Sequence, residues 1–166
     1  GTSLCTTGQY VNPAPPPNSL GFTIYEQAIA ILPIYEMQIE PYNPRHLDAV
    51  VCLSLRAWTP IFDSIQNAMD SDVYQSFYPD NWRVSQQKAV EDVCAAEDTN
   101  VWVALDAGST VGFVAVKLDS ESSMGEIYMV AVDPDFQGQG IGSSLIEFAL
   151  AWMKDAGMSI AMVETG

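Results

Sequence analysis

A glycine-rich turn is the segment of this 166-residue chain whose residue types and spacing point most directly to chemistry. It reads Gln-Gly-Gln-Gly-Ile-Gly over residues 137–142, follows an apolar run at 126–132 and opens an amphipathic run at Ile141. Glycine has no Cβ to block a ligand, and a helix N-terminus carries partial positive charge, so backbone N–H groups there can converge on an anion. The pattern predicts a site for a ligand that carries phosphate.

Two common phosphate-binding loops fit this turn poorly. A P-loop needs Gly-Lys-Ser/Thr after its first glycine and four further residues, and here no lysine follows before Lys154. A dinucleotide fingerprint needs a third glycine where this chain has Ser143, and it directly follows a strand, whereas residues 133–136 intervene here. Glu164 stands roughly where a ribose-binding acid would lie, so a nicotinamide-dinucleotide enzyme remains an alternative.

A third pattern, Gln/Arg-x-x-Gly-x-Gly/Ala, is satisfied by Gln137, Gly140 and Gly142. Together with the preceding strand, Val-Asp-Pro and the long helix that follows, it resembles the acetyl-CoA-binding core of the GCN5-related N-acetyltransferases (GNAT). The resemblance covers residues 126–164, and residues 37–125 fit the family's order of elements without a motif. It implies acetyl-CoA as acyl donor, with the pyrophosphate held by loop amides. By position these come from Gln137, Gly138, Gln139, Gly140, Ile141, Gly142 and Ser143.

The resemblance also implies acyl transfer from a thioester to an amine, which must lose a proton before it attacks. Glu126, at the start of the apolar strand, matches a glutamate that draws this proton through water in family members; the alternative is a solvated acid at a strand end. A strand period of two puts Glu126 on the face of Val130 and Val132. The backbones of these two valines are expected to bind the pantetheine arm, and an N–H near Val130 to polarise the thioester carbonyl.

Four aromatic residues are candidates for an acceptor pocket, because family acceptor sites draw on the first two helices and the loop after them. These are Trp58, Phe62, Tyr78 and Trp82. Aromatic faces suit cationic amines, although ordinary core packing is the alternative. His46 is the only histidine and the three cysteines lie far apart, so we expect neither a bound metal nor a triad mechanism.

The composition limits the classes of molecule that the protein is expected to bind. Six Lys and Arg against 21 Asp and Glu give a net charge of -15, which argues against nucleic acid and favours cationic amines; the alternative is that the acidity serves solubility. An apolar fraction of 48% predicts a globular domain. No apolar run reaches the roughly 18 residues of a membrane helix, and a reduced cytoplasm is the expected location.

The periodicities predict an α/β domain at 37–166 behind an N-terminal extension at 1–36, which holds a proline-rich stretch and two apolar, strand-like runs at 22–25 and 28–35. The domain is expected to have a central mixed sheet flanked by helices, in the order β-α-α-α-β-β-β-α-β. The expected elements are a strand at 37–41, a helix capped by Asn43, a second helix from Thr59 to Met69, a loop at 71–82, a helix at 85–96, strands at 101–105, 111–118 and 124–132, a helix from Ile141 to Gly157, and a strand at 160–163.

Compared with the family, the sequence is expected to lack the elements that follow the fifth core strand, and no residue is assigned as general acid. We expect the strand edge left open to be covered by residues 22–35 or by a second chain, in a homodimer formed by strand pairing or exchange. The predicted function is acetylation of a primary amine by direct attack in a ternary complex. A non-catalytic CoA-binding or assembly module on the same fold is the alternative.

Overall fold

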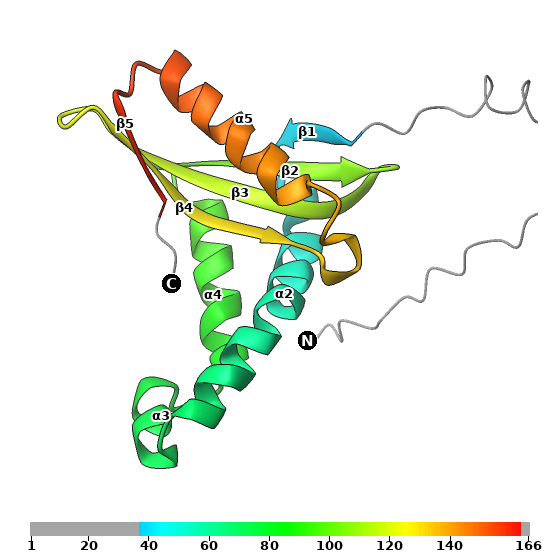
Figure 1. Ribbon diagram of the computed structural model, residues 1–166, viewed down its shortest axis with the longest axis vertical. Helices are drawn as coiled ribbons and strands as arrows, with labels where there is room; N and C mark the ends of the chain where they lie inside the picture. The colour runs from blue at the N-terminus through cyan, green and yellow to red at the C-terminus, as the bar shows by residue number, and fades with distance from the viewer. Residues whose placement is uncertain (1–36, 164–166) are drawn as a thin grey trace, which may run out of the picture. The chain divides into compact units, whose positions relative to one another are not determined.

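The structure is a computed structural model that describes residues 37–163, and these residues form one compact unit (Figure 1). The expectations for residues 1–36 and for Glu164 lie outside the described residues. The described elements are β1 Gln38–Pro41, the 3-10 turn η1 Pro44–His46, α2 Leu47–Ala68, α3 Ser71–Phe77, α4 Trp82–Ala95, β2 Thr99–Asp106, β3 Ser109–Asp119, β4 Met124–Val132, η2 Pro134–Phe136, α5 Ile141–Asp155 and β5 Ile160–Val163. No helix within this range is long and apolar enough to cross a membrane.

The five strands form one sheet in the order β1-β2-β3-β4-β5. The first four pair antiparallel as a meander, and β5 pairs parallel to β4 after the α5 crossover. The mixed sheet flanked by helices is therefore as predicted. A dinucleotide fold needs a largely parallel sheet with reversed strand order, so this topology opposes the nicotinamide alternative.

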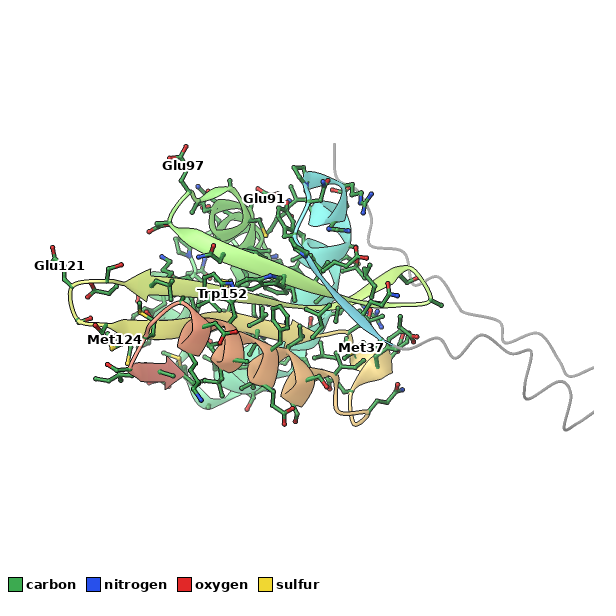
Figure 2. The ribbon with its side chains drawn as sticks, turned by 90° about the horizontal axis from the view of Figure 1, so that it is seen from above. Met37, Glu91, Glu97, Glu121, Met124 and Trp152 are labelled. Carbon is green, nitrogen blue, oxygen red and sulfur yellow. The ribbon has the colours of Figure 1, made fainter. Side chains whose placement is uncertain are left out.

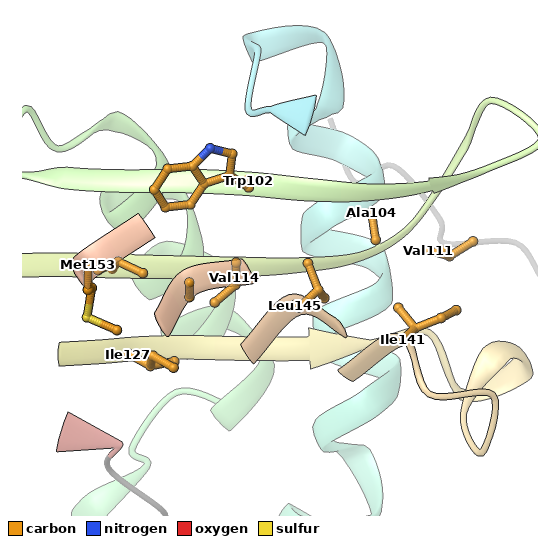
Figure 3. Close-up of a cluster of buried hydrophobic side chains, with 10 residues drawn as sticks. Trp102, Ala104, Val111, Val114, Ile127, Ile141, Leu145 and Met153 are labelled. Atoms are coloured by element: carbon orange, nitrogen blue, oxygen red, sulfur yellow. The ribbon is translucent and has the colours of Figure 1, made fainter. Parts of the chain in front are cut away.

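One core lies between the sheet and α5 (Figure 3). Ile141, Leu145, Ala149 and Met153 recur at helical spacing on α5 and are buried against alternate residues of β2, β3 and β4. Trp102 of β2 meets the rings of Phe148 and Trp152 edge to face, and Trp152 lies between α5 and the sheet (Figure 2). α5 ends at Asp155, and Met153 fills its last buried position.

The second core lies on the opposite face, where α2 and α4 cover the sheet (Figure 1). It is centred on Phe113 of β3, and Val50 and Leu53 of α2 and Val90 of α4 are almost fully buried around it. Because both faces of β3 are covered, all residues from Val111 to Val116 are buried. The two packed layers hold the end of β4 and the start of α5 in place.

Three local predictions were wrong around α2. The Thr59-Pro60 pair does not begin a new helix: the Thr59 hydroxyl donates to the Leu55 carbonyl at 2.6 Å, and α2 continues through Pro60. Residues 71–77 form the short helix α3 instead of a loop. α4 begins at Trp82, three residues before its predicted start, because the Asn81 side chain accepts from the Arg83 N–H at 2.9 Å.

The strand β5 is exposed along its whole described length, with Ile160 at 57% and Met162 at 41% of full exposure. An exposed apolar strand is a feature that soluble proteins commonly cover. The candidate cover at residues 22–35 lies outside the described residues. The homodimer formed by strand pairing stays a prediction.

Candidate active site

A groove of about 460 Å³ lies where the end of β4 meets the start of α5 and the middle of α2. It gathers most of the residues that the sequence singled out. Those on its walls are Trp58, Val130, Val132, Gln137, Gly138, Gly140, Ile141, Gly142 and Ser143. The sequence did not single out Ala57, Ile61, Ala131, Phe136 and Ile146, which also line it.

The glycine turn presents free backbone donors to this groove. Gly138 and Gly140 have φ of 79° and 82°, a left-handed conformation that side chains disfavour. Gly140 is the N-cap of α5, and no side chain caps this helix. The first N–H groups of an α-helix have no intrahelical acceptor, so the amides of Ile141, Gly142 and Ser143 are available to an anion. The side-chain amide of Gln137 ties the turn to β4, because its Nε2 donates to the Val132 carbonyl at 3.2 Å.

Gly142 differs from the other two glycines of the turn. It lies inside the first turn of α5, and its φ is not in the left-handed region. A Cβ placed there would meet only the Cγ2 atom of Val132, at an ordinary 3.6 Å. Neither the backbone nor the protein's own packing therefore requires glycine, although glycine weakens a helix by about 1 kcal/mol relative to alanine. Its lack of a side chain keeps this wall of the groove open.

The second feature of the site is a stretch of β4 that, among the described residues, no strand pairs on one side. β5 pairs only with Met124–Ile127 of β4, over Ile160–Val163. The residues from Tyr128 to Val132 therefore extend past the described part of β5, while on their other side they continue to pair with β3. Backbone N–H and C=O groups on that free edge can bond an extended ligand, as a strand would.

A β-bulge changes the faces of β4 between Glu126 and the groove. Ala115 of β3 pairs with Met129 and Val116 pairs with Ile127, so Tyr128 is an extra residue on β4. The expectation that Glu126 shares a face with Val130 and Val132 was therefore wrong, because one inserted residue shifts the alternation. Ile127, Val130 and Val132 pack toward α5.

Glu126 instead faces the side of the sheet covered by α2 and α4. A Cβ at its neighbour Gly125 would meet Met153 of α5, so the alternation turns Glu126 to the other face. It stands directly opposite Lys117 on β3, whose ammonium lies 4.1 Å from the centre of the Tyr128 ring. Glu126 does not line the groove itself. The Glu126 side chain thus lies near the bulge, on the side of the sheet that α2 and α4 cover.

The structure separates the four aromatic candidates into two places. Trp58 lines the groove. Phe62 stacks on Trp82 with ring centres 4.2 Å apart, and Tyr78 meets Phe62 edge to face at 5.4 Å. Trp82 is 7% exposed. Phe62, Tyr78 and Trp82 therefore pack against one another where α2, α3 and α4 meet.

An ion-pair network joins α2 to the turn before the glycines, and sequence reasoning missed it. Arg56 bonds both carboxylate oxygens of Asp133, at 2.9 and 2.8 Å, and one of Asp135, at 3.0 Å. The partners lie 77 and 79 residues apart in the chain, so no local pattern marks them. The sequence signal that existed was the pair of acids around Pro134.

The histidine and the described free cysteine lie away from the groove. His46 is buried and caps η1, with its Nδ1 accepting from the Asn43 N–H at 3.0 Å; burial, with Arg45 beside it, lowers its pKa. Burial raises the pKa of the Cys94 thiol to about 11. A protonated thiol is a poor nucleophile, so this geometry gives no support to covalent thiol chemistry.

The site thus combines a helix start without a side-chain cap with strand residues of β4 that the described part of β5 does not pair. The Acetyltransferase (GNAT) family matches residues 69–166, and the chain belongs to this family. Among curated relatives, it is similar to mycothiol acetyltransferase of Propionibacterium freudenreichii subsp. shermanii, at 38% identity over 55 residues, 32% of this chain and 18% of the relative. IAA acetyltransferase of Azospirillum brasilense is 35% identical over 72 residues, 43% of this chain and 47% of the relative. The matches thus span less than half of either relative.

Solved structures share the fold at low identity. A GNAT family acetyltransferase from Brucella melitensis, in complex with acetyl-CoA, has a TM-score of 0.58 and 22% identity over 80% of this chain and 77% of its own. The ribosomal-protein-S18-alanine N-acetyltransferase of Escherichia coli has a TM-score of 0.57 and 18% identity, over 78% and 67%. An aminoglycoside N-acetyltransferase in complex with CoA has 0.56 and 17%, over 82% and 81%. The predicted GNAT-like fold is confirmed.

Proposed function

We propose that this protein is an N-acetyltransferase that moves an acetyl group from acetyl-CoA to a primary amine in a ternary complex. The observation that carries the proposal is the joining of two features in one groove: the uncapped glycine turn at the start of α5 and the free edge of β4. A phosphate group fits the first and an extended amide-bearing arm fits the second. Acetyl-CoA carries both in one molecule, and family membership agrees with this donor.

In this proposal the pyrophosphate lies on the amides of Ile141, Gly142 and Ser143, and the backbones of the other loop residues complete the cradle. The pantetheine arm runs along β4 and bonds the backbones of Val130 and Val132. A backbone N–H near Val130 polarises the thioester carbonyl and stabilises the oxyanion that forms on it. The acetyl group then lies close to the β-bulge at Tyr128.

Glu126 is proposed as the general base. The amine nitrogen, once it has lost a proton to Glu126 through a water molecule, attacks the carbonyl carbon of the thioester. The tetrahedral intermediate collapses, the C–S bond breaks, and CoA leaves as a thiolate, which takes up the second proton that the attacking nitrogen loses on becoming an amide. Because Glu126 faces the α2 side of the sheet, the amine is expected to enter from that side, opposite to α5.

The acceptor is proposed to be cationic. Trp58 gives the groove an aromatic face, and the net charge of -15 attracts amines at long range. Two structural neighbours are an aminoglycoside N-acetyltransferase and a ribosomal-protein-S18-alanine N-acetyltransferase, whose acceptors differ in size. Both a small polyamine-like molecule and a peptide amine fit the proposal.

Two experiments test this function. Calorimetry compares acetyl-CoA with NADH, and we expect acetyl-CoA alone to bind tightly; tighter binding of NADH would refute the proposal. A thiol-release assay across a broad amine panel, at low and high salt, then measures turnover. Acetyl-CoA binding without amine-dependent thiol release would identify a non-catalytic CoA-binding module. Loss of activity at high salt would support electrostatic capture of the acceptor.

A further inference from the structure

We propose that Arg56 is a positioning residue for the phosphate end of the groove, an inference that rests on the proposed function. It neutralises two carboxylates beside the glycine turn and holds α2 against that turn. The residue belongs to no sequence motif, and its side chain is not on the groove wall. We infer its role from its ion pairs, which connect α2 to Asp133 and Asp135.

The guanidinium of Arg56 serves two acids at once. Its Nη1 donates to both oxygens of Asp133, and its Nη2 donates to Asp135. The side chains of Arg56 and Asp133 are 30% and 16% exposed, so their ion pair is partly shielded from solvent. Two of the three ion pairs among the described residues belong to Arg56. Because the planar guanidinium donates from both Nη atoms, it fixes the orientation of the two carboxylates and also neutralises charge.

Asp133 connects this network to the sheet and to the glycine turn. Its N–H donates to the Val111 carbonyl at 2.8 Å, and its Oδ1 accepts from the Asp135 N–H at 2.9 Å, which shapes η2. The chain then passes through Phe136 into Gln137, both on the groove wall. A shift of Asp133 would therefore be transmitted to the turn that is proposed to hold pyrophosphate.

Charge gives a second reason for Arg56. The turn before the glycines carries two carboxylates, yet the proposed ligand is a polyanion. Like charges this close to a binding loop repel the ligand unless they are paired, and at short range salt screens them only in part. Arg56 offsets this repulsion locally in a protein whose net charge is -15.

The position of Arg56 on α2 links the network to the opposite wall. Pro60 has no N–H, so it does not donate to the carbonyl of Arg56 four residues earlier, and the helix lacks one bond at this point. The neighbours Ala57 and Trp58, and Ile61 one turn on, line the groove. The ion pairs thus brace α2 at its weakened turn and set the distance between its wall and the glycine turn.

The test compares three variants with the parent. Arg56→Met removes the charge, the triple variant Arg56→Met/Asp133→Asn/Asp135→Asn also removes the repulsion, and Lys88→Met is the control. Lys88→Met removes the same charge and breaks the ion pair between Lys88 and Asp92, both of which lie on α4. Calorimetry measures the Kd for acetyl-CoA and for S-acetylpantetheine, which carries no phosphate. Thermal unfolding verifies that each variant is folded, and Arg56→Lys, which keeps the charge, replaces Arg56→Met if the latter is not.

We expect Arg56→Met to raise the Kd for acetyl-CoA by about tenfold, equivalent to about 1.4 kcal/mol, and to leave the Kd for S-acetylpantetheine unchanged. The triple variant removes the repulsion but also lacks the ion pairs that brace α2, so it should recover part of the affinity and stay weaker than the parent. Arg56→Lys should lose about threefold, and Lys88→Met should match the parent. Equal losses for both ligands, or full recovery of the parent's Kd in the triple variant, would overturn the positioning role. A parent that does not bind acetyl-CoA would overturn the proposed function itself, whereas a binding parent with an unaffected Arg56→Met variant would overturn this inference alone.

Discussion

Gly142 and Val132 face each other across the entrance to α5, and a Cβ added to Gly142 would stand 3.6 Å from the Val132 Cγ2 atom. The protein therefore has room for alanine at this position. The adjoining groove would lose that room, because Gly142 lies on its wall beside the helix amides. Stability and ligand binding should respond in opposite directions when the side chain is added.

Gly142→Ala should leave the protein folded and raise its stability by up to about 1 kcal/mol, because alanine is a better helix former. It should also raise the Kd for acetyl-CoA by about tenfold, since the methyl group obstructs the approach to the amides. Thermal unfolding and calorimetry measure the two effects. Ala151→Gly, on the exposed side of the same helix, is the matched control and should lower stability without changing binding. Unchanged affinity in Gly142→Ala would refute the pyrophosphate site.

Glu126→Gln should lower turnover by about 100-fold while the Kd for acetyl-CoA stays near that of the parent, because the amide cannot accept the amine proton. Steady-state thiol release and calorimetry separate these effects. Glu121→Gln, in the exposed turn before β4, removes the same charge and should retain full turnover. If Glu126→Gln keeps turnover within about a factor of two of the parent, Glu126 is a surface acid.

Gly125→Ala should destabilise the fold by about 1–3 kcal/mol, since the new Cβ would overlap the Met153 side chain in the core under α5. Urea unfolding measures the loss. The pair Gly125→Ala/Met153→Ala should lose less than the sum of the two single variants, because Met153→Ala makes room for the new Cβ and that Cβ fills part of the space left. Strict additivity would show that Met153 moves aside without cost.

The Cys94 thiol should make stability fall at high pH. Its pKa is raised by burial from 9.0 to about 11, so between these values the folded state holds a proton that the unfolded state has lost. The stabilisation is therefore complete below about pH 9 and declines as the pH rises toward 11. Urea unfolding across this range should show a shallower decline in Cys94→Ala. The pKa of Tyr42 is raised by burial and, next, by Cys94, so Cys94→Ala also reduces the shift of Tyr42, which makes the decline shallower still. Identical slopes would contradict the assignment.

Local sequence patterns predicted most helices and strands of the fold. The predictions were wrong where long-range packing determines the local structure. The hairpin between β2 and β3 and the strand-turn-helix from Met124 to Asp155 follow from residue periodicity and glycine placement. The prediction that a new helix begins at Thr59-Pro60 was wrong for two reasons. A threonine hydroxyl can donate a hydrogen bond to a carbonyl of its own helix, and a helix held by tertiary packing tolerates one missing backbone hydrogen bond. α3 is a seven-residue helix, too short for its periodicity to distinguish it from a loop.

The residues of one short segment predict where the glycine turn and the helix start form, because left-handed glycines and a helix start are properties of a few neighbouring residues such as Gly138 and Gly140. The residues that surround that turn are placed by strand pairing and helix packing across the whole domain. The bulge at Tyr128 arises from pairing with β3, and it turns Glu126 away from the face of Val130. The approach of Arg56 to Asp133 depends on α2 packing against the sheet, 77 residues distant in the chain. Contacts of this kind depend on how whole helices and strands pack, and short-range backbone preferences do not contain that information.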